Sequence, residues 1–261
     1  MIITIPVEEI LMQALVFLRV GAVFFALPVF GDPPTPVRAR ILLALSFSWA
    51  IQGIIPPEWM GTIPDEPFAY GILVLREVLI GLMLGFVAKL TFAGLTMAAS
   101  IVGYQMGFGT ASLLVPDAEQ QMDGFTAFHR ILMMLIFFSL NLHMVYLQSI
   151  SESFRLIPVG MANPHPDLLG LFTAWSAAIF STAIQLAAPI LVALMFTMAA
   201  LGLVARTVPQ MNVFTLSFPF SFMVGLLVYI STMVFFPGWV QEYFVREQEN
   251  ILLTIKGLAP S

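Results

Sequence analysis

Cysteine is absent from the 261 residues, which excludes disulfide bonds, thiolate metal sites and cysteine nucleophiles. Charge is also scarce, because only 10% of the residues are Asp, Glu, Lys or Arg, against about 25% in a typical soluble domain. The net charge of −5 is spread thinly and includes no basic run, so we expect no nucleic-acid partner.

Catalytic and cofactor motifs are missing as well. The sequence has no HExxH, GxSxG, Walker A or GxGxxG motif. No two of His129, His143 and His165 are three or four residues apart, as a metal-binding pair on one helix would be. We therefore expect no enzyme activity, no metal site and no cofactor.

Apolar residues make up 59% of the chain, which is too many for a water-soluble globule of this length. They form long runs separated by short polar or proline-rich connectors. This pattern predicts an all-α, polytopic membrane-type protein of about six long hydrophobic helices. Composition leaves open whether lipid or partner subunits cover these helices. The runs are Ile10–Phe30, Ile41–Ile55, Phe68–Pro116, Ile131–Ser151, Leu168–Ala205 and Thr207–Gln241.

The run Leu168–Ala205 is too long for a simple membrane span. As one helix it would reach roughly 57 Å, whereas a bilayer core is about 30 Å thick. Pro189 lies near its middle and predicts a kink. The run is either a kinked helix that extends beyond the bilayer or part of a hairpin with Thr207–Gln241.

Charges near the N-terminus suggest an orientation. Arg38 and Arg40 lie in the first connector, whereas Pro56–Pro67 carries only acidic charges. The positive-inside rule therefore places the first connector in the cytoplasm and the N-terminus outside. The first apolar segment follows Glu8 and Glu9 without any Lys or Arg, so we expect it to be retained rather than cleaved as a signal peptide.

Four charged residues interrupt apolar runs: Arg19, Arg76, Glu77 and Lys89. One interpretation is a stand-alone, ion-coupled secondary transporter with Glu77 and Arg76 in its coupling site. The favoured interpretation is structural: the charged ends of these side chains reach the membrane–water interface or form an interhelical ion pair.

Small residues predict close helix packing, either within the chain or against partners. Gly81 and Gly85 form a GxxxG motif, and Gly103 follows on the same run. The closely spaced Gly103, Gly107 and Gly109 disfavour a continuous helix, so we expect a loop over residues 100–117. That loop is either a tight turn or a constriction that seals a pore with apolar side chains.

Several motifs occur in an order that resembles the FliR family, the R subunits of the flagellar type III export gate, which has relatives in virulence secretion systems. The most specific block is Leu201-Gly202-(x3)-Arg206-(x2)-Pro209-Gln210-Met211-Asn212-Val213-Phe214. Weaker matches are Pro28-Val29-Phe30-Gly31, Glu77-(x3)-Gly81-(x3)-Gly85, Gly103-Tyr-Gln105-Met106-Gly107-Phe108, Asn141-Leu-His143, Ala188-Pro189, Phe218-Pro219 and Gly225.

The resemblance implies a non-enzymatic subunit of the flagellar export gate in the bacterial inner membrane, at the flagellar basal body. One R subunit would assemble with several P and Q subunits, contact the B-type gate subunit and pass unfolded flagellar proteins. Residues 1–167 would resemble a P subunit and residues 168–241 a Q-subunit hairpin, with residues 242–261 as a charged tail that looks like a surface helix.

The resemblance also assigns roles to two segments. The loop would plug the pore through Gln105, Met106, Gly107, Phe108, Gly109, Leu113 and Leu114. A turn at the cytoplasmic entrance would consist of Arg206, Pro209, Gln210, Met211 and Asn212. Two departures from the family pattern are Val115-Pro116-Asp117 in the loop and Phe220-Ser221-Phe222, where a basic residue often follows the proline.

Overall fold

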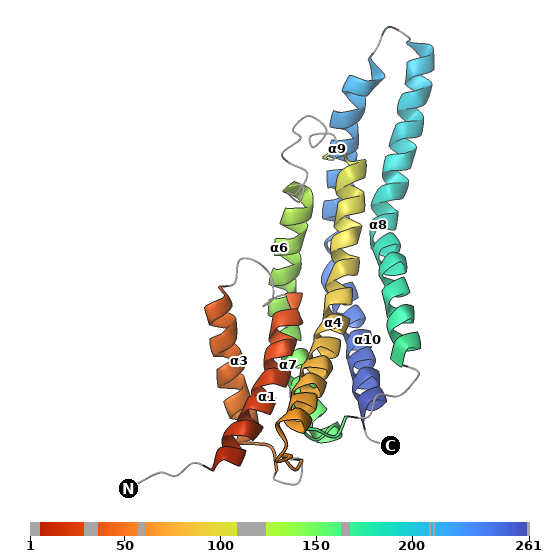
Figure 1. Ribbon diagram of the computed structural model, residues 1–261. Helices are drawn as coiled ribbons and strands as arrows, with labels where there is room; N and C mark the ends of the chain where they lie inside the picture. The colour runs from red at the N-terminus through yellow and green to blue at the C-terminus, as the bar shows by residue number, and fades with distance from the viewer. Residues whose placement is uncertain are drawn as a thin grey trace. The chain divides into compact units, whose positions relative to one another are not determined.

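The computed structural model in Figure 1 describes residues 6–28, 36–56, 61–108, 124–162, 168–208, 210 and 212–259. All regular structure in these ranges is helical, which confirms the predicted all-α class. The helices are α1 (Val7–Ala26), α3 (Val37–Gln52), α4 (Pro67–Gln105), α6 (Gly124–Ser139), α7 (Leu142–Leu156), α8 (Leu168–Thr207), α9 (Val213–Thr232) and α10 (Phe236–Leu258).

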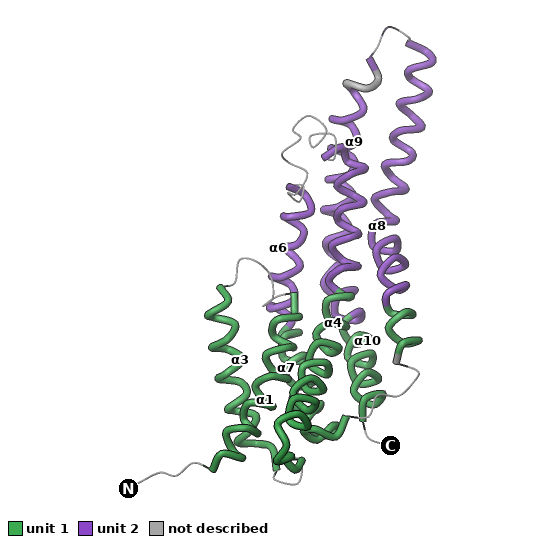
Figure 2. Tube along the Cα trace, viewed as in Figure 1, with its two compact units in different colours: residues 1–91, 141–175, 244–261 green, residues 92–140, 176–243 purple. Residues whose placement is uncertain are grey.

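The chain divides into two compact units, shown in Figure 2. Unit 1 comprises residues 1–91, 141–175 and 244–261, and unit 2 comprises residues 92–140 and 176–243. Helices α4, α8 and α10 each supply residues to both units. These units follow packing, whereas the division into 1–167, 168–241 and 242–261 follows the family resemblance, and that division stays a prediction.

In unit 1, α1 presents a buried stripe that includes Leu15, Val16, Val20 and Val23. Spacings of three and four residues place these side chains on one face of the helix. The end of α10 also packs into this unit, because Phe244, Ile251, Ile255 and Leu258 are buried. The charged tail is therefore one face of an amphipathic helix whose other face is buried in the chain.

The core of unit 2 joins four helices through one apolar cluster. Its buried members come from α4 and the residue that follows it, α6, α8 and α9, and Phe108 and Phe222 pack against it. Residues far apart in the sequence thus share a single core. The members are Ala99, Val102, Met106, Phe125, Ala187, Ile190, Leu194 and Tyr229.

Within the described residues, three helices are long and apolar enough to cross a membrane, α1, α4 and α8. The number rises to five if each of two bent pairs counts as one span, compared with the expected total of about six. The run Ile131–Ser151, expected as one span, consists of α6 and α7, which are bent by 66° where Asn141 adopts a φ of 55°. The run Thr207–Gln241 is likewise divided between α9 and α10, with a bend of 65°.

The long run Leu168–Ala205 forms one helix, α8, of 40 residues with Pro189 in its interior. At 1.5 Å per residue, such a helix is about 60 Å long. Its residues Ala187, Ile190 and Leu194 share the unit 2 core with Tyr229 of α9. The run therefore packs against α9, as the hairpin alternative predicts, whereas the kink at Pro189 and an extension beyond the bilayer stay predictions.

Candidate functional site

Helix α4 ends in a glycine-dependent turn at the beginning of the predicted plug. The Phe108 amide donates to the Gly103 carbonyl and the Gly107 amide to the Tyr104 carbonyl, each at 3.0 Å. Gly107 has a φ of +97°, in the left-handed region that glycine adopts without steric cost. These features are those of a Schellman motif, which closes the C-terminal end of a helix.

The prediction that the loop begins at Ser100 is wrong, because residues 100–105 are helical. Glycine inside a helix costs only about 1 kcal/mol relative to alanine. Val102 and Met106 are buried in the unit 2 core, and this burial outweighs the penalty at Gly103. Gly107 lies just beyond the helix, where its conformational freedom is needed.

Met106 is fully buried and rests against Gly225 of α9. A Cβ atom at position 225 would lie 2.7 Å from the Met106 Cγ, so a glycine is required for this close approach. The sequence drew attention to Gly225 only as part of a family motif. Its close contact with Met106 joins segments that are far apart in the sequence, so no local pattern indicates it.

Aromatic rings hold the next two residues of the turn. The Phe108 ring centroid lies 6.0 Å from that of Phe125 in α6 and 5.7 Å from that of Phe222 in α9. A Cβ at Gly107 would lie 2.5 Å from Cδ2 of Phe218. We call Met106–Phe108, together with their contacts on α6 and α9, the loop anchor.

The structure therefore places Met106, Gly107 and Phe108 of the predicted plug together. Gln105 is the last residue of α4 and is partly buried. The other three predicted plug residues, Gly109, Leu113 and Leu114, lie outside the described residues.

The predicted entrance turn follows α8. Arg206 is exposed in the last turn of α8, where a cation interacts favourably with the helix dipole. Gln210 and Asn212 are also exposed, and the Asn212 carbonyl accepts the Leu216 amide at 3.3 Å near the start of α9. Pro209 and Met211 lie outside the described residues.

The predicted packing glycines of α4 let α1 approach closely within unit 1. A Cβ at Gly81 would collide with the Arg19 carbonyl oxygen and lie 2.7 Å from the Ala22 Cβ. A Cβ at Gly85 would collide with the Ala26 Cβ. Both glycines thus serve packing within the chain, whereas Gly103 is buried and supplies a carbonyl to the Schellman motif.

We expect Gly81→Ala and Gly85→Ala each to lower the free energy of unfolding by roughly 1–3 kcal/mol, because the added methyl group overpacks the α1–α4 contact. Unfolding of the purified chain in detergent, titrated with a denaturing detergent, measures the change. Gly71→Ala on the same helix is the matched control, since no atom lies within 4 Å of its Cβ position. A loss for Gly71→Ala equal to that at Gly81 would contradict the packing role.

A buried ion pair joins α1 to α4 in unit 1. Nε of Arg19 lies 2.5 Å from Oε2 of Glu77, and both side chains are fully buried. The Gly160 amide donates to Oε1 of Glu77 at 2.7 Å. Nη1 of Arg19 donates to the Ile157 carbonyl at 2.9 Å, and its guanidinium lies 4.2 Å from the Phe154 ring centroid.

This geometry decides between the two interpretations of the charges in the apolar runs. Both oxygens of Glu77 are engaged within the chain, and Arg76 is exposed with its Nη1 3.5 Å from the Gly160 carbonyl. The interhelical ion pair is confirmed for Arg19 and Glu77. A transporter would need a carboxylate that exchanges its partner during transport, and this one is held on both sides.

No cluster of three or more His, Asp or Glu side chains suited to a metal ion occurs in the part of the chain that the structure describes. His129 instead lies 2.8 Å through Nδ1 from the Tyr229 hydroxyl in unit 2. That contact was not expected from the sequence, which offers no spacing rule for residues so far apart.

Comparisons with known proteins all match this chain to bacterial export proteins or flagellar biosynthetic proteins. A family model described as bacterial export proteins, family 1, matches residues 10–246. The flagellar biosynthetic protein FliR of Bacillus subtilis (strain 168) is 33% identical over 222 residues, which cover 84% of this chain and 85% of the relative. FliR of Caulobacter vibrioides is 32% identical over 237 residues, covering 90% and 94% of the two chains. FliR of Escherichia coli (strain K12) is 27% identical over 238 residues, covering 91% and 90%.

Proposed function

Because the chain belongs to the bacterial export proteins, family 1, we propose that it lines and closes the channel of the flagellar export gate. Its relatives are flagellar biosynthetic proteins, and the chain is a flagellar export-gate subunit needed for flagellum assembly. It works in the bacterial inner membrane, at the flagellar basal body, where unfolded flagellar proteins are its cargo. This role requires no covalent chemistry and no cofactor.

The loop anchor carries the proposal that this subunit closes the channel. It holds Met106 and Phe108 in an apolar core at the end of a 39-residue apolar helix, directly before the predicted plug residues Gly109, Leu113 and Leu114. Non-helical backbone at membrane depth is tolerated where it is buried in protein or lines a cavity. Bulky apolar side chains in such a loop exclude water and ions from a narrow pore.

Opening needs a conformational change but no breakage of bonds. Gly107 has backbone freedom on both sides of φ = 0, so it is suited to act as the hinge between the buried Met106 and the plug. Cargo that pushes against the plug would rotate the loop about this residue. The loop anchor then returns the plug to the closed position.

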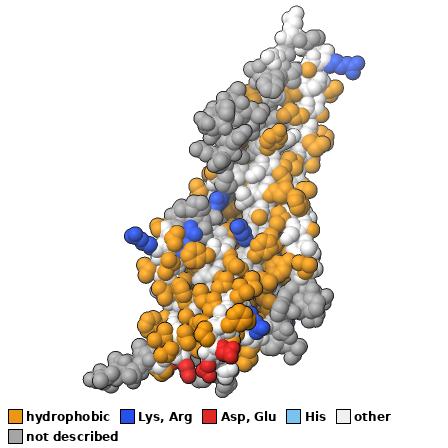
Figure 3. Space-filling view, in the orientation of Figure 1, with side chains coloured by type: hydrophobic (Ala, Val, Ile, Leu, Met, Phe, Trp, Pro, Cys, Tyr) orange, Lys and Arg blue, Asp and Glu red, His pale blue; other side chains and the backbone are white. Residues whose placement is uncertain are grey.

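Partner subunits would cover much of the apolar surface. The most apolar part of α8 is only 17% buried within the chain, and Figure 3 shows broad hydrophobic areas on one face of the molecule. P and Q subunits packed around α8 and α9 would remove this surface from lipid. The entrance turn at Arg206–Asn212 would then face the B-type subunit at the cytoplasmic mouth.

Co-expression with P and Q subunits, followed by mass measurement of the intact complex, tests this proposal. We expect one copy of this chain with several copies of P and Q. A stable monomer or homodimer that ignores co-expressed P and Q subunits would contradict the gate and favour a stand-alone transporter.

A further inference from the structure

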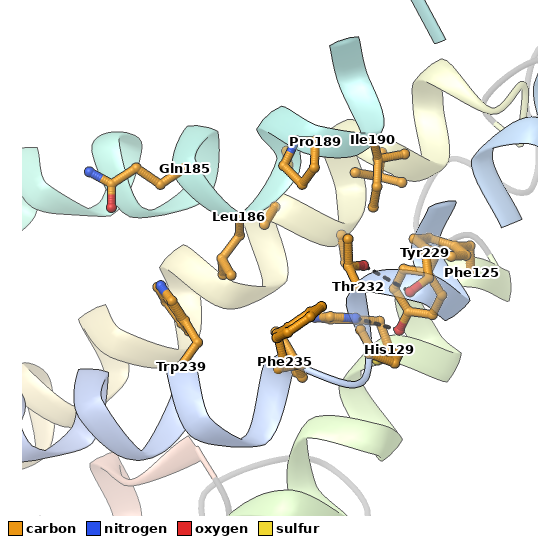
Figure 4. Close-up of a pocket in the computed structure, with 16 residues that line it drawn as sticks. Phe125, His129, Gln185, Leu186, Pro189, Ile190, Tyr229, Thr232, Phe235 and Trp239 are labelled. Atoms are coloured by element: carbon orange, nitrogen blue, oxygen red, sulfur yellow. Dashed lines mark hydrogen bonds between the residues drawn. The ribbon is translucent and has the colours of Figure 1, made fainter. Parts of the chain in front are cut away.

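A cavity of about 210 Å³ lies within unit 2 and shares its wall with the core cluster. Figure 4 shows Gln185, Leu186 and Pro189 of α8 on one side of it, with His129 and Trp239 across from them. Its lining is largely apolar and aromatic. For comparison, an apolar cavity of about 150 Å³ is large enough to bind benzene.

One polar group in the cavity wall lacks a partner. His129 is only 5% exposed, and its Nε2 has no hydrogen-bond partner among the described residues. The rest of the ring is held in place, with Nδ1 2.8 Å from the Tyr229 hydroxyl and ring contacts to Phe125 and Phe236. Buried polar atoms in native proteins are normally hydrogen-bonded, so this nitrogen points to an occupant.

The hydrogen-bond network assigns the proton on this nitrogen. If the Tyr229 hydroxyl donates to Nδ1, every polar group of the pair is satisfied except Nε2–H. The opposite arrangement would leave the phenol hydrogen without an acceptor among the described residues, and Nε2 would still be unpaired. The first arrangement is therefore favoured, and it makes Nε2–H of His129, a residue of the cavity wall, the unpaired donor.

We propose that this cavity binds an apolar molecule that carries a single carbonyl oxygen. The oxygen accepts from Nε2–H of His129, and the apolar body packs against Phe125, Phe236 and Trp239. Two sources supply this chemistry: an acyl ester of a bilayer lipid, or a free small ketone. Because Phe125 lines the cavity and also packs against Phe108 in the loop anchor, an occupant also stiffens the closed gate, a consequence that rests on the proposed function.

Photolabelling with benzophenone, an aromatic ketone, tests the site on the full chain assembled with its partner subunits in lipid nanodiscs. We expect saturable labelling within residues 98–102, 185–190 and 229–239, located by mass spectrometry. Diphenylmethane, which has the same rings but no carbonyl, should compete about three- to tenfold more weakly than unlabelled benzophenone, as expected for the loss of one hydrogen bond. Equal competition would overturn the proposal without the need for any variant.

Variants of the chain give a second, independent comparison. His129→Phe retains a ring and removes the donor, so we expect benzophenone to bind about three- to tenfold more weakly. His143→Phe, on α7 in unit 1, is the matched control and should label as the unmodified chain does. Identical labelling of the His129 and His143 variants, or labelling that does not saturate, would overturn the site.

Nanodiscs of ester-linked and ether-linked phospholipid distinguish the two sources. If a lipid ester is the natural occupant, benzophenone binds more weakly in ester-linked discs, because the lipid competes for the cavity. Equal binding in both assigns the site to a free small ketone. This readout is independent of protein export, so failure of the plug proposal would leave it unchanged.

Discussion

Substitution of Glu77 by leucine is expected to lower the free energy of unfolding by about 3–5 kcal/mol. The change leaves the guanidinium of Arg19 fully buried without its counter-ion. It also removes the acceptor of the Gly160 amide, so the turn after α7 loses this hydrogen bond to α4. Denaturant titration of the purified chain in detergent measures the loss, and the amount of folded chain in membranes should fall in parallel.

The double variant Arg19→Leu/Glu77→Leu should regain part of this loss, because no uncompensated charge remains buried. Full recovery is not expected, since Arg19 also donates to the Ser153 and Ile157 carbonyls. The exposed pair of Arg155 and Glu152 on α7 is the control, and Arg155→Ala should cost about 1 kcal/mol or less. Equal losses for Glu77→Leu and Arg155→Ala would show that the buried pair is not a stabilising contact.

The sequence predicted the helical class and most of the helices because their apolar runs are long and their connectors are polar. It missed the break between α6 and α7, since Leu140-Asn141-Leu142 lies in an uncharged run that looks continuous. The break depends on the φ of 55° at Asn141, and asparagine is among the few non-glycine residues that adopt this conformation readily.

The sequence predicted only part of the candidate site. The glycines at 103 and 107 indicated a departure from helix, but local preference alone placed the loop too early. Burial of Met106 against Gly225 extends α4 to Gln105, and such contacts between distant segments have no local sequence pattern. The same limit applies to Arg19 and Glu77. The sequence shows both as charges in apolar runs, but it does not show that they pair, because they are 58 residues apart.

Replacement of Met106–Gly109 by a flexible Gly-Ser linker of the same length should open the gate to small solutes. Truncation of a buried methionine such as Met106 costs about 2–5 kcal/mol, and the half-buried Phe108 would also lose its ring contacts in the loop anchor. About 5.5 kcal/mol moves a two-state equilibrium from 1:99 to 99:1, so most gates should stand open. Uptake of a small membrane-impermeant dye by cells that carry the variant measures the leak.

Tyr104→Ser is the matched control for this replacement. Tyr104 lies in the last turn of α4, next to the loop anchor, but its side chain is 73% exposed. Cells that carry it should remain sealed to the dye. A leak of equal size in both variants would indicate general damage to the complex rather than loss of the plug.

Electrical conductance of purified complexes in a planar bilayer tests the plug most directly. Complexes with the unmodified chain should be closed, and complexes of the same composition with the Met106–Gly109 linker should conduct small ions continuously. Linker complexes that assemble fully and yet stay closed would contradict the proposal that this loop seals the channel.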